Sequence, residues 1–128
     1  MKTKVYDSSA LLAVVFSEPG APVVLRELED GLGLVCAVNW AEVASKMQES
    51  GVTSDEVASE LSIFDLQVCA FDGQQALATG ALRPVTKALG LSLGDRACLA
   101  LAQSRKATVV TADRAWKKLK GFELVVIR

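Results

Sequence analysis

Residues 91–105, LSLGDRACLALAQSR, decide the fold class. Ser92 and Asp95 have the spacing of a capping box, which predicts a helix that begins after Ser92 and runs through Arg105. The central part of this helix, residues 97–102, is apolar almost all round, which is typical of a helix buried in the middle of a domain. Such a helix needs further structure packed around it, and the flanking sequence supplies it.

Short β-type runs alternate with helical runs along the rest of the chain. The expected strands are residues 4–6, 33–37, 66–71, 107–110 and 123–127. The expected helices are residues 8–18, 21–30, 40–50, a helix opened by Thr53, 73–82 and 114–120, with a loop or broken helix over 83–91. This alternation predicts βαβ units. We expect one α/β domain, residues 1–128, with a mostly parallel five-stranded sheet and helices on both faces.

The composition excludes several kinds of chemistry. The chain has no histidine, which removes Ser-His and Cys-His nucleophile pairs and the usual zinc sites. Cys36, Cys69 and Cys98 stand in apolar stretches and form no CxxC pair, so we expect reduced thiols packed in the core. Catalysis would therefore have to use carboxylates, hydroxyls, lysine and arginine.

The overall charge gives little support to nucleic-acid binding. The formal net charge is −1 and the pI about 5.4, whereas proteins that bind nucleic acid through counterion release are usually basic. A nucleic-acid enzyme of this composition would need local positive charge, such as a bound metal. No apolar run approaches the roughly 20 residues that span a bilayer, and Asp7-Ser8-Ser9 interrupts a signal-like start. We expect a cytoplasmic protein without membrane association.

Three aspartates are expected at one rim of the sheet. Asp7 directly follows the first strand, Asp113 follows strand 107–110, and Asp95 lies in the first turn of the central helix. Each position suits a helix cap, but in parallel α/β sheets the carboxyl ends of the strands also form the functional sites. Crowded carboxylates repel one another unless a divalent cation lies between them, and Mg²⁺ or Mn²⁺ prefers oxygen ligands.

Glu42 is harder to place from its spacing. Trp40, Val43 and Met47 form the apolar face of its helix, and Glu42 lies nearly opposite, as a solvated surface acid would. Glu42 can join the three aspartates only if its helix is packed on both sides. Both alternatives remain open at this point.

Four segments resemble the PIN-domain family, in particular VapC-type toxins of toxin–antitoxin systems. These are VYDSSALL (residues 5–12), NWAEV (39–43), LSLGDRACLALA (91–102) and VVTADRAW (109–116). They occur in the family's order, and their order and spacing extend over nearly the whole chain. The resemblance places Asp7, Glu42, Asp95 and Asp113 at the four acidic positions. Ala112 departs from the pattern, because the family often has Asn there to support the neighbouring acid.

The resemblance implies an endoribonuclease in which Asp7, Asp95 and Asp113, with Glu42 directly or through water, hold Mg²⁺ or Mn²⁺. Such an ion lowers the pKa of a bound water, which would then attack the RNA phosphodiester. Ser8 and Thr111 would support the carboxylates. The implied partners are RNA, a VapB-type antitoxin and a second copy in a homodimer. Candidate phosphate contacts are Arg83, Arg96, Arg114, Lys117 and Lys118.

Other functions share parts of this pattern. A haloacid-dehalogenase-like phosphatase also has Asp after the first strand, but needs a second Asp where this chain has Ser9. A receiver-like domain would use Asp72 as phosphoacceptor, whereas we expect Asp72 to be a helix cap. A non-catalytic interaction module is the third alternative. A dimer or antitoxin interface is expected to use apolar residues of the first two helices, although ordinary core packing is expected for at least half of them. These residues are Leu11, Leu12, Val15, Phe16, Val23 and Val24.

Overall fold

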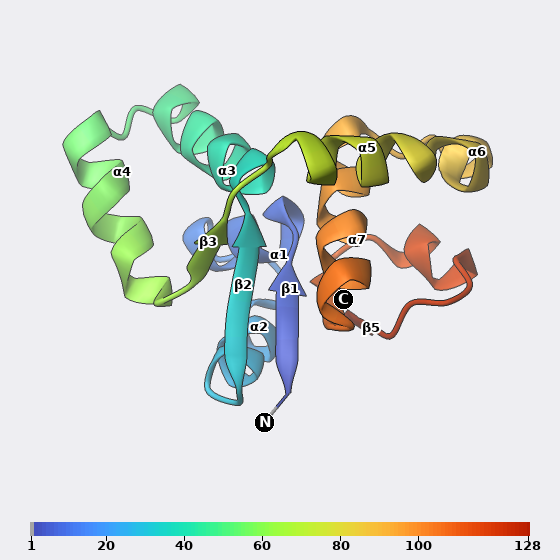
Figure 1. Cartoon of the computed structure of the whole chain (residues 1–128). Coiled ribbons are helices and arrows are strands. Elements are labelled where there is room, and N and C mark those ends of the chain that lie inside the picture. Colours follow the sequence, from blue (N-terminus) through green and yellow to red (C-terminus); the bar gives the residue numbers. More distant parts are fainter. Residues whose placement is uncertain (1) are drawn as a thin grey trace.

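The computed structural model describes residues 2–128, which form a five-stranded sheet covered by helices (Figure 1). The strands are β1 (Thr3–Tyr6), β2 (Leu32–Cys36), β3 (Gln67–Cys69), β4 (Thr108–Thr111) and β5 (Leu124–Val126). They lie in the order β3-β2-β1-β4-β5, and every pairing between neighbours is parallel. The expected α/β fold is confirmed, and the five strands of this sheet are all parallel.

Two helical layers enclose the sheet. The α-helices are α1 (Ser8–Val15), α2 (Ala21–Leu28), α3 (Ala37–Glu49), α4 (Ser54–Leu61), α5 (Gly73–Ala81), α6 (Arg83–Thr86) and α7 (Leu93–Arg105), and the 3₁₀ turns are η1 (Ser62–Phe64), η2 (Lys87–Leu89) and η3 (Arg114–Lys118). Helices α1, α2 and α4 share one apolar core with the sheet, and α5 and α7 share the other. Helix α3 contacts both α1 and α7, above the strand ends (Figure 1). No helix within residues 2–128 has the length and apolar character needed to cross a bilayer.

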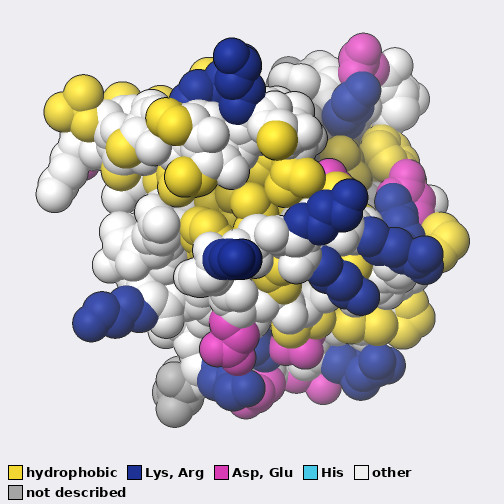
Figure 2. Space-filling model, turned by 90° about the vertical axis from the view of Figure 1, so that its right-hand side faces the viewer, with side chains coloured by type: hydrophobic (Ala, Val, Ile, Leu, Met, Phe, Trp, Pro, Cys, Tyr) yellow, Lys and Arg dark blue, Asp and Glu magenta, His cyan; other side chains and the backbone are white. Residues whose placement is uncertain are grey.

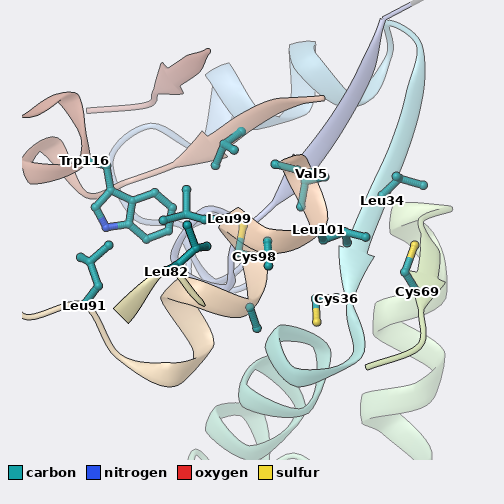
Figure 3. Close-up of a cluster of buried hydrophobic side chains, with 14 residues drawn as sticks. Val5, Leu34, Cys36, Cys69, Leu82, Leu91, Cys98, Leu99, Leu101 and Trp116 are labelled. Carbon is teal, nitrogen blue, oxygen red and sulfur yellow. The ribbon is translucent and has the colours of Figure 1, made fainter. Parts of the chain in front are cut away.

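The strands alternate side chains between the two cores. Val5 of β1 points to the core that contains α7, and the next residue, Tyr6, points to the core that contains α1. In the α7 core, Leu99 and Cys98 lie among side chains of the sheet and Trp116 of η3 (Figure 3). The three cysteines are free and buried, as the sequence predicts. Helix α7 is thus the expected central helix.

Several element boundaries differ from the prediction, and one of these differences matters for function. Helix α1 ends at Val15 because Ser17 takes a left-handed conformation, with φ 53°. Helix α3 begins at Ala37, three residues before the expected start, so Glu42 lies in its second turn. The expected helix at residues 114–120 is the 3₁₀ turn η3, and the expected broken helix at residues 83–91 is α6 followed by η2. The early start of α3 brings Glu42 towards the strand ends.

We expect Leu99→Ala to lower the free energy of unfolding by about 3 kcal/mol, because it leaves a cavity beside the central strand. Leu99 is fully buried, whereas Leu77 on α5 is 79% exposed. Urea denaturation of the two alanine variants measures the difference. A loss for Leu77→Ala as large as that for Leu99→Ala would contradict the central role of α7.

Candidate active site

Four acidic residues come from elements that meet at the carboxyl ends of β1 and β4. Asp7 caps α1 directly after β1, and Asp113 lies two residues after β4. Asp95 lies in the first turn of α7, and Glu42 in the second turn of α3. The chain builds the sheet outwards from β1 to β3 and then returns to β4 on the other side, so the strand order reverses between β1 and β4. Parallel α/β sheets bind their ligands at such a point.

Asp7 is buried, with 3% of its surface exposed, and its carboxylate is surrounded by hydrogen-bond donors. The Ala10 amide donates to Oδ1 at 2.8 Å, the Thr111 hydroxyl to Oδ2 at 2.6 Å, and the Ser9 hydroxyl lies 2.7 and 2.9 Å from the two oxygens. Each hydroxyl is fixed by a backbone amide in turn: the Ser9 hydroxyl accepts a hydrogen bond from the Ala112 amide, and the Thr111 hydroxyl accepts one from the Asp113 amide. The network therefore directs three donors at one carboxylate.

Burial raises the pKa of Asp7 to about 6, and the negative charge of Asp95 adds to this rise. The hydrogen bonds from Thr111, Ala10 and Ser9 act in the opposite direction, because they stabilise the charged form. The carboxylate is therefore ionised at neutral pH, but at a cost in desolvation. A cation at this place would remove that cost.

Glu42 is held against the first turn of α7. Its Oε1 accepts hydrogen bonds from the Ser8 hydroxyl and from the Asn39 side-chain amide, both at 3.1 Å. The Asn39 amide also donates to the Gly94 carbonyl oxygen at 3.0 Å. A Cβ atom at Gly94 would lie 2.5 Å from Glu42 Oε2, so glycine is needed for this approach. Glu42 is thus half-buried and held between α1 and α7, close to the strand ends, and does not project freely into solvent.

Asp95 and Asp113 each use one carboxylate oxygen as a cap. Asp95 Oδ2 accepts from the Ser92 amide while the Ser92 hydroxyl accepts from the Asp95 amide, so the predicted capping box is confirmed. Asp113 Oδ1 accepts from the Ala115 amide at the start of η3. The second oxygen of each carboxylate accepts no hydrogen bond from residues 2–128. These two acids therefore combine a structural contact with a free ligand atom.

The charges of Asp7, Asp95 and Glu42 all act on the same buried thiol. Burial, first of all, raises the pKa of Cys98 well above its ordinary value, and the three acids raise it further. Asp113 is exposed and joins them only through the bond from its amide to Thr111. As the side chains stand, no three carboxylates or thiols within residues 2–128 are grouped tightly enough to hold one metal ion. The rim thus brings Asp7, Glu42 and Asp95 near one buried thiol, with Asp113 at its edge, but not into one tight cluster.

Comparison with known proteins agrees with this arrangement. The family model described as PIN domain matches residues 4–121. This chain belongs to the PIN-domain family. A comparison with curated protein sequences gives no match.

Solved structures share the fold over almost the whole chain. DNA-bound VapBC from Salmonella typhimurium superposes with a TM-score of 0.78 at 19% identity, covering 100% of both chains. VapBC2 from Rickettsia felis, bound to a DNA fragment from its promoter, gives 0.77 at 17% identity, covering 98% of this chain and 99% of the other. VapC20 from Mycobacterium tuberculosis, described as a sarcin-ricin loop cleaving toxin, gives 0.73 at 10%, covering 93% and 95%. At these identities the likeness establishes the fold.

The side chains of this PIN domain suit a hard cation. The four acidic side chains at the rim offer oxygen atoms as metal ligands, which Mg²⁺ and Mn²⁺ prefer. Asp95 and Asp113 each keep one carboxylate oxygen that accepts no hydrogen bond from residues 2–128. Asn39 Oδ1 is buried and has no hydrogen-bond partner among the described residues. The donor set therefore fits Mg²⁺ or Mn²⁺.

Two supporting residues of the PIN domain were not predicted. Ser9 contacts Asp7 more closely than Ser8 does, since Ser8 bonds to Glu42 instead. Asn39 precedes Glu42 by three residues, a helical spacing that could have identified it. Ala112 takes part in the network through its backbone, because its amide donates to the Ser9 hydroxyl that contacts Asp7.

The predicted interface on α1 and α2 needs a correction. Leu11 and Val24 are fully buried in the core shared with the sheet, so they cannot face a partner. The other predicted residues are partly or fully exposed: Leu12, Val15, Phe16 and Val23.

Without metal, the free energy of unfolding should fall as the pH rises from about 4 to 6, because Asp7 must lose its proton in a buried place. Asp7 has a pKa of about 6 in the fold and about 3.9 in the unfolded chain, so the native state binds more protons in this range. In EDTA, the free energy of unfolding of Asp7→Asn should therefore rise by about 2 kcal/mol relative to that of the parent between pH 4 and pH 7. Urea denaturation at both pH values measures this gain. Parallel pH profiles of parent and variant would show that Asp7 titrates normally.

Proposed function

We propose that this PIN domain is a Mg²⁺- or Mn²⁺-dependent endoribonuclease and the toxin of a toxin–antitoxin pair. The observation that carries the proposal is the buried Asp7 carboxylate at the carboxyl ends of β1 and β4, where Ser9 and Thr111 hold it. Glu42 and Asp95 come to the same end of the sheet from α3 and from the first turn of α7. With Asp113 at the edge, these acids provide oxygen ligands at the strand ends of a fold shared with VapC toxins. The proposal extends to residues 1–128 as one catalytic domain.

Each acidic residue has a part in this mechanism. Asp7, Asp95 and Asp113, with Glu42 directly or through water, would hold the ion, which supplies a Lewis acid for phosphate and a water of lowered pKa. Thr111 and Ser9 keep Asp7 ionised and fix its orientation. Ser8 and Asn39 fix Glu42, so the chain orients both carboxylates before substrate binds.

The phosphatase and receiver alternatives lack the contacts they need. Ser9 occupies the place of the second phosphatase acid, and its hydroxyl is already bonded to Asp7. Asp72 is exposed and caps α5 by accepting from the Gln75 amide, as expected of a helix cap. Neither residue is arranged for phosphoryl transfer to aspartate.

A partner surface is proposed beside the site. A groove of about 540 Å³ between α1 and α3 includes Ser8, Leu12, Glu42 and Lys46. Phe16, at the end of α1, is 41% exposed. One structural neighbour is described as a toxin–antitoxin complex. We propose that an antitoxin segment or a second copy of the chain covers this part of α1.

Asp95→Asn should reduce RNA cleavage at least about 100-fold, since it removes a charged metal ligand, while Asn can still accept from the Ser92 amide. Cleavage of total RNA with Mg²⁺ or Mn²⁺, and with EDTA as a blank, measures the effect. Asp72→Asn is the matched control and should cleave as the parent does. Mg²⁺ should also raise the melting temperature of the parent more than that of Asp95→Asn. Cleavage that persists in EDTA would overturn the metal dependence.

The double change Leu12→Asp and Phe16→Asp should break the proposed partner contact, because charged groups are costly in an apolar interface. Light scattering of the chain alone, and co-purification with the product of an adjacent small reading frame, measure dimer and antitoxin binding. Leu77→Asp, at an exposed apolar residue on α5, is the control. Loss of binding in Leu77→Asp alone would place the interface elsewhere.

A further inference from the structure

The near-neutral net charge conceals two oppositely charged parts of the chain. Residues 1–72 contain four Lys or Arg against twelve Asp or Glu, a formal charge of −8. Residues 73–122 contain nine Lys or Arg against two Asp or Glu, a formal charge of +7. The two acids in this second part are Asp95 and Asp113 of the proposed active site. A polyanion would therefore be attracted to one part of the molecule and repelled by the other.

The basic part lies together in space. Residues 73–122 include β4 of the sheet and the elements α5, α6, α7 and η3, which lie together on one side of it (Figure 1). Seen from that side, several Lys and Arg side chains surround an apolar hollow (Figure 2). The five predicted phosphate contacts belong to this segment, and Arg83, Lys117 and Lys118 are exposed there.

The hollow has a volume of about 540 Å³ and lies between α6, α7 and η3. Its apolar walls include Val85, Leu89, Leu119 and Phe122, while Lys118 and Lys120 line it with positive charge. We call these six residues the basic hollow. A second hollow of about 290 Å³ adjoins it, sharing Gln103 and Phe122, and adds Lys106 beside one acid, Glu123.

The basic hollow is connected to the acidic rim by two elements. Helix α7 has Asp95 in its first turn and reaches the hollow at Gln103, eight residues and roughly 12 Å further along the axis. The turn η3 is capped by Asp113 and ends at Lys118. A few nucleotides of RNA could therefore reach from the rim to the hollow.

We propose that the basic hollow binds an unpaired nucleotide of the RNA substrate, next to the nucleotides at the acidic rim; this rests on the proposed nuclease function. The base stacks on Phe122 between Leu89 and Leu119, and Lys118 and Lys120 contact the flanking phosphates. An aromatic side chain within a cationic groove is a common arrangement for single-stranded RNA. A second copy docking here symmetrically would bring the two lysine pairs together, which charge repulsion disfavours.

Binding can be measured without cleavage, in the Asp95→Asn background and in EDTA. The probes are a labelled single-stranded RNA of about 12 nucleotides and a duplex of the same sequence. Phe122→Leu keeps an apolar side chain against the α7 core and removes the stacking face, so single-strand affinity should fall about 10-fold. A cooperative melting transition shows that the variant is folded. Lys118→Gln with Lys120→Gln should lower the salt slope, d log K/d log[salt], by about 1.4. The charge-matched control, Lys2→Gln with Arg26→Gln on the other side, should keep the parent slope.

Three results would overturn the subsite. The first is RNA affinity and salt slope like those of the parent in both hollow variants, and the second is an equal loss of affinity in the Lys2 and Arg26 control. The third is a changed oligomeric state of the hollow variants by light scattering, which would mark a protein interface. RNA cleavage by the unmodified chain with Mg²⁺ tests the proposed function separately. If the unmodified chain cleaves RNA but the hollow variants bind RNA as the parent does, the subsite in the hollow is rejected and the nuclease function stands. If the chain neither cleaves nor binds RNA, both proposals are rejected.

Discussion

The burial of the Asp7 carboxylate is the constraint around which the rest of the site is arranged. A buried charge is tolerated only when donors replace water, and here the donors come from α1 and from the end of β4. Their positions depend on the sheet, because Tyr6 pairs with Val110 and the Asp7 amide continues this ladder by donating to the Val110 carbonyl at 3.1 Å. Thr111 is thereby placed beside Asp7, 104 positions away in sequence. The parallel pairing of β1 with β4 thus builds the site.

Helix capping and ligand binding are compatible roles for the same acids. A cap needs one oxygen, and a carboxylate has two. In Asp95 and in Asp113, one carboxylate oxygen accepts a hydrogen bond from a backbone amide, which leaves the other oxygen available. The caps fix where α7 and η3 begin, so folding itself brings these oxygens to the rim. The stabilising contact therefore also positions the functional group.

Local patterns predicted most of the fold and the places of Asp7, Asp95 and Asp113 in it. Strand–helix alternation and the Ser92–Asp95 capping box are properties of adjacent residues, and both are confirmed. Glu42 could not be placed by periodicity, because its orientation depends on α3 lying between α1 and α7 and on the missing Cβ of Gly94. Ser9 was missed because a hydroxyl in a first helical turn usually serves as an ordinary polar residue, and only the tertiary contact with Ala112 shows its role.

Net charge averages over segments that the fold separates. The chain is near neutrality as a whole, yet its second part is strongly basic and contains two of the rim acids. Acids that hold a cation would repel phosphate before the cation binds, so positive charge close to them but outside the rim offsets that repulsion. The acidic first part limits attraction of nucleic acid elsewhere on the surface. In the proposed nuclease, a substrate polyanion would thereby be directed to the side where α7 and η3 connect the hollow with the carboxylates, which is where an enzyme of nearly neutral charge needs its affinity.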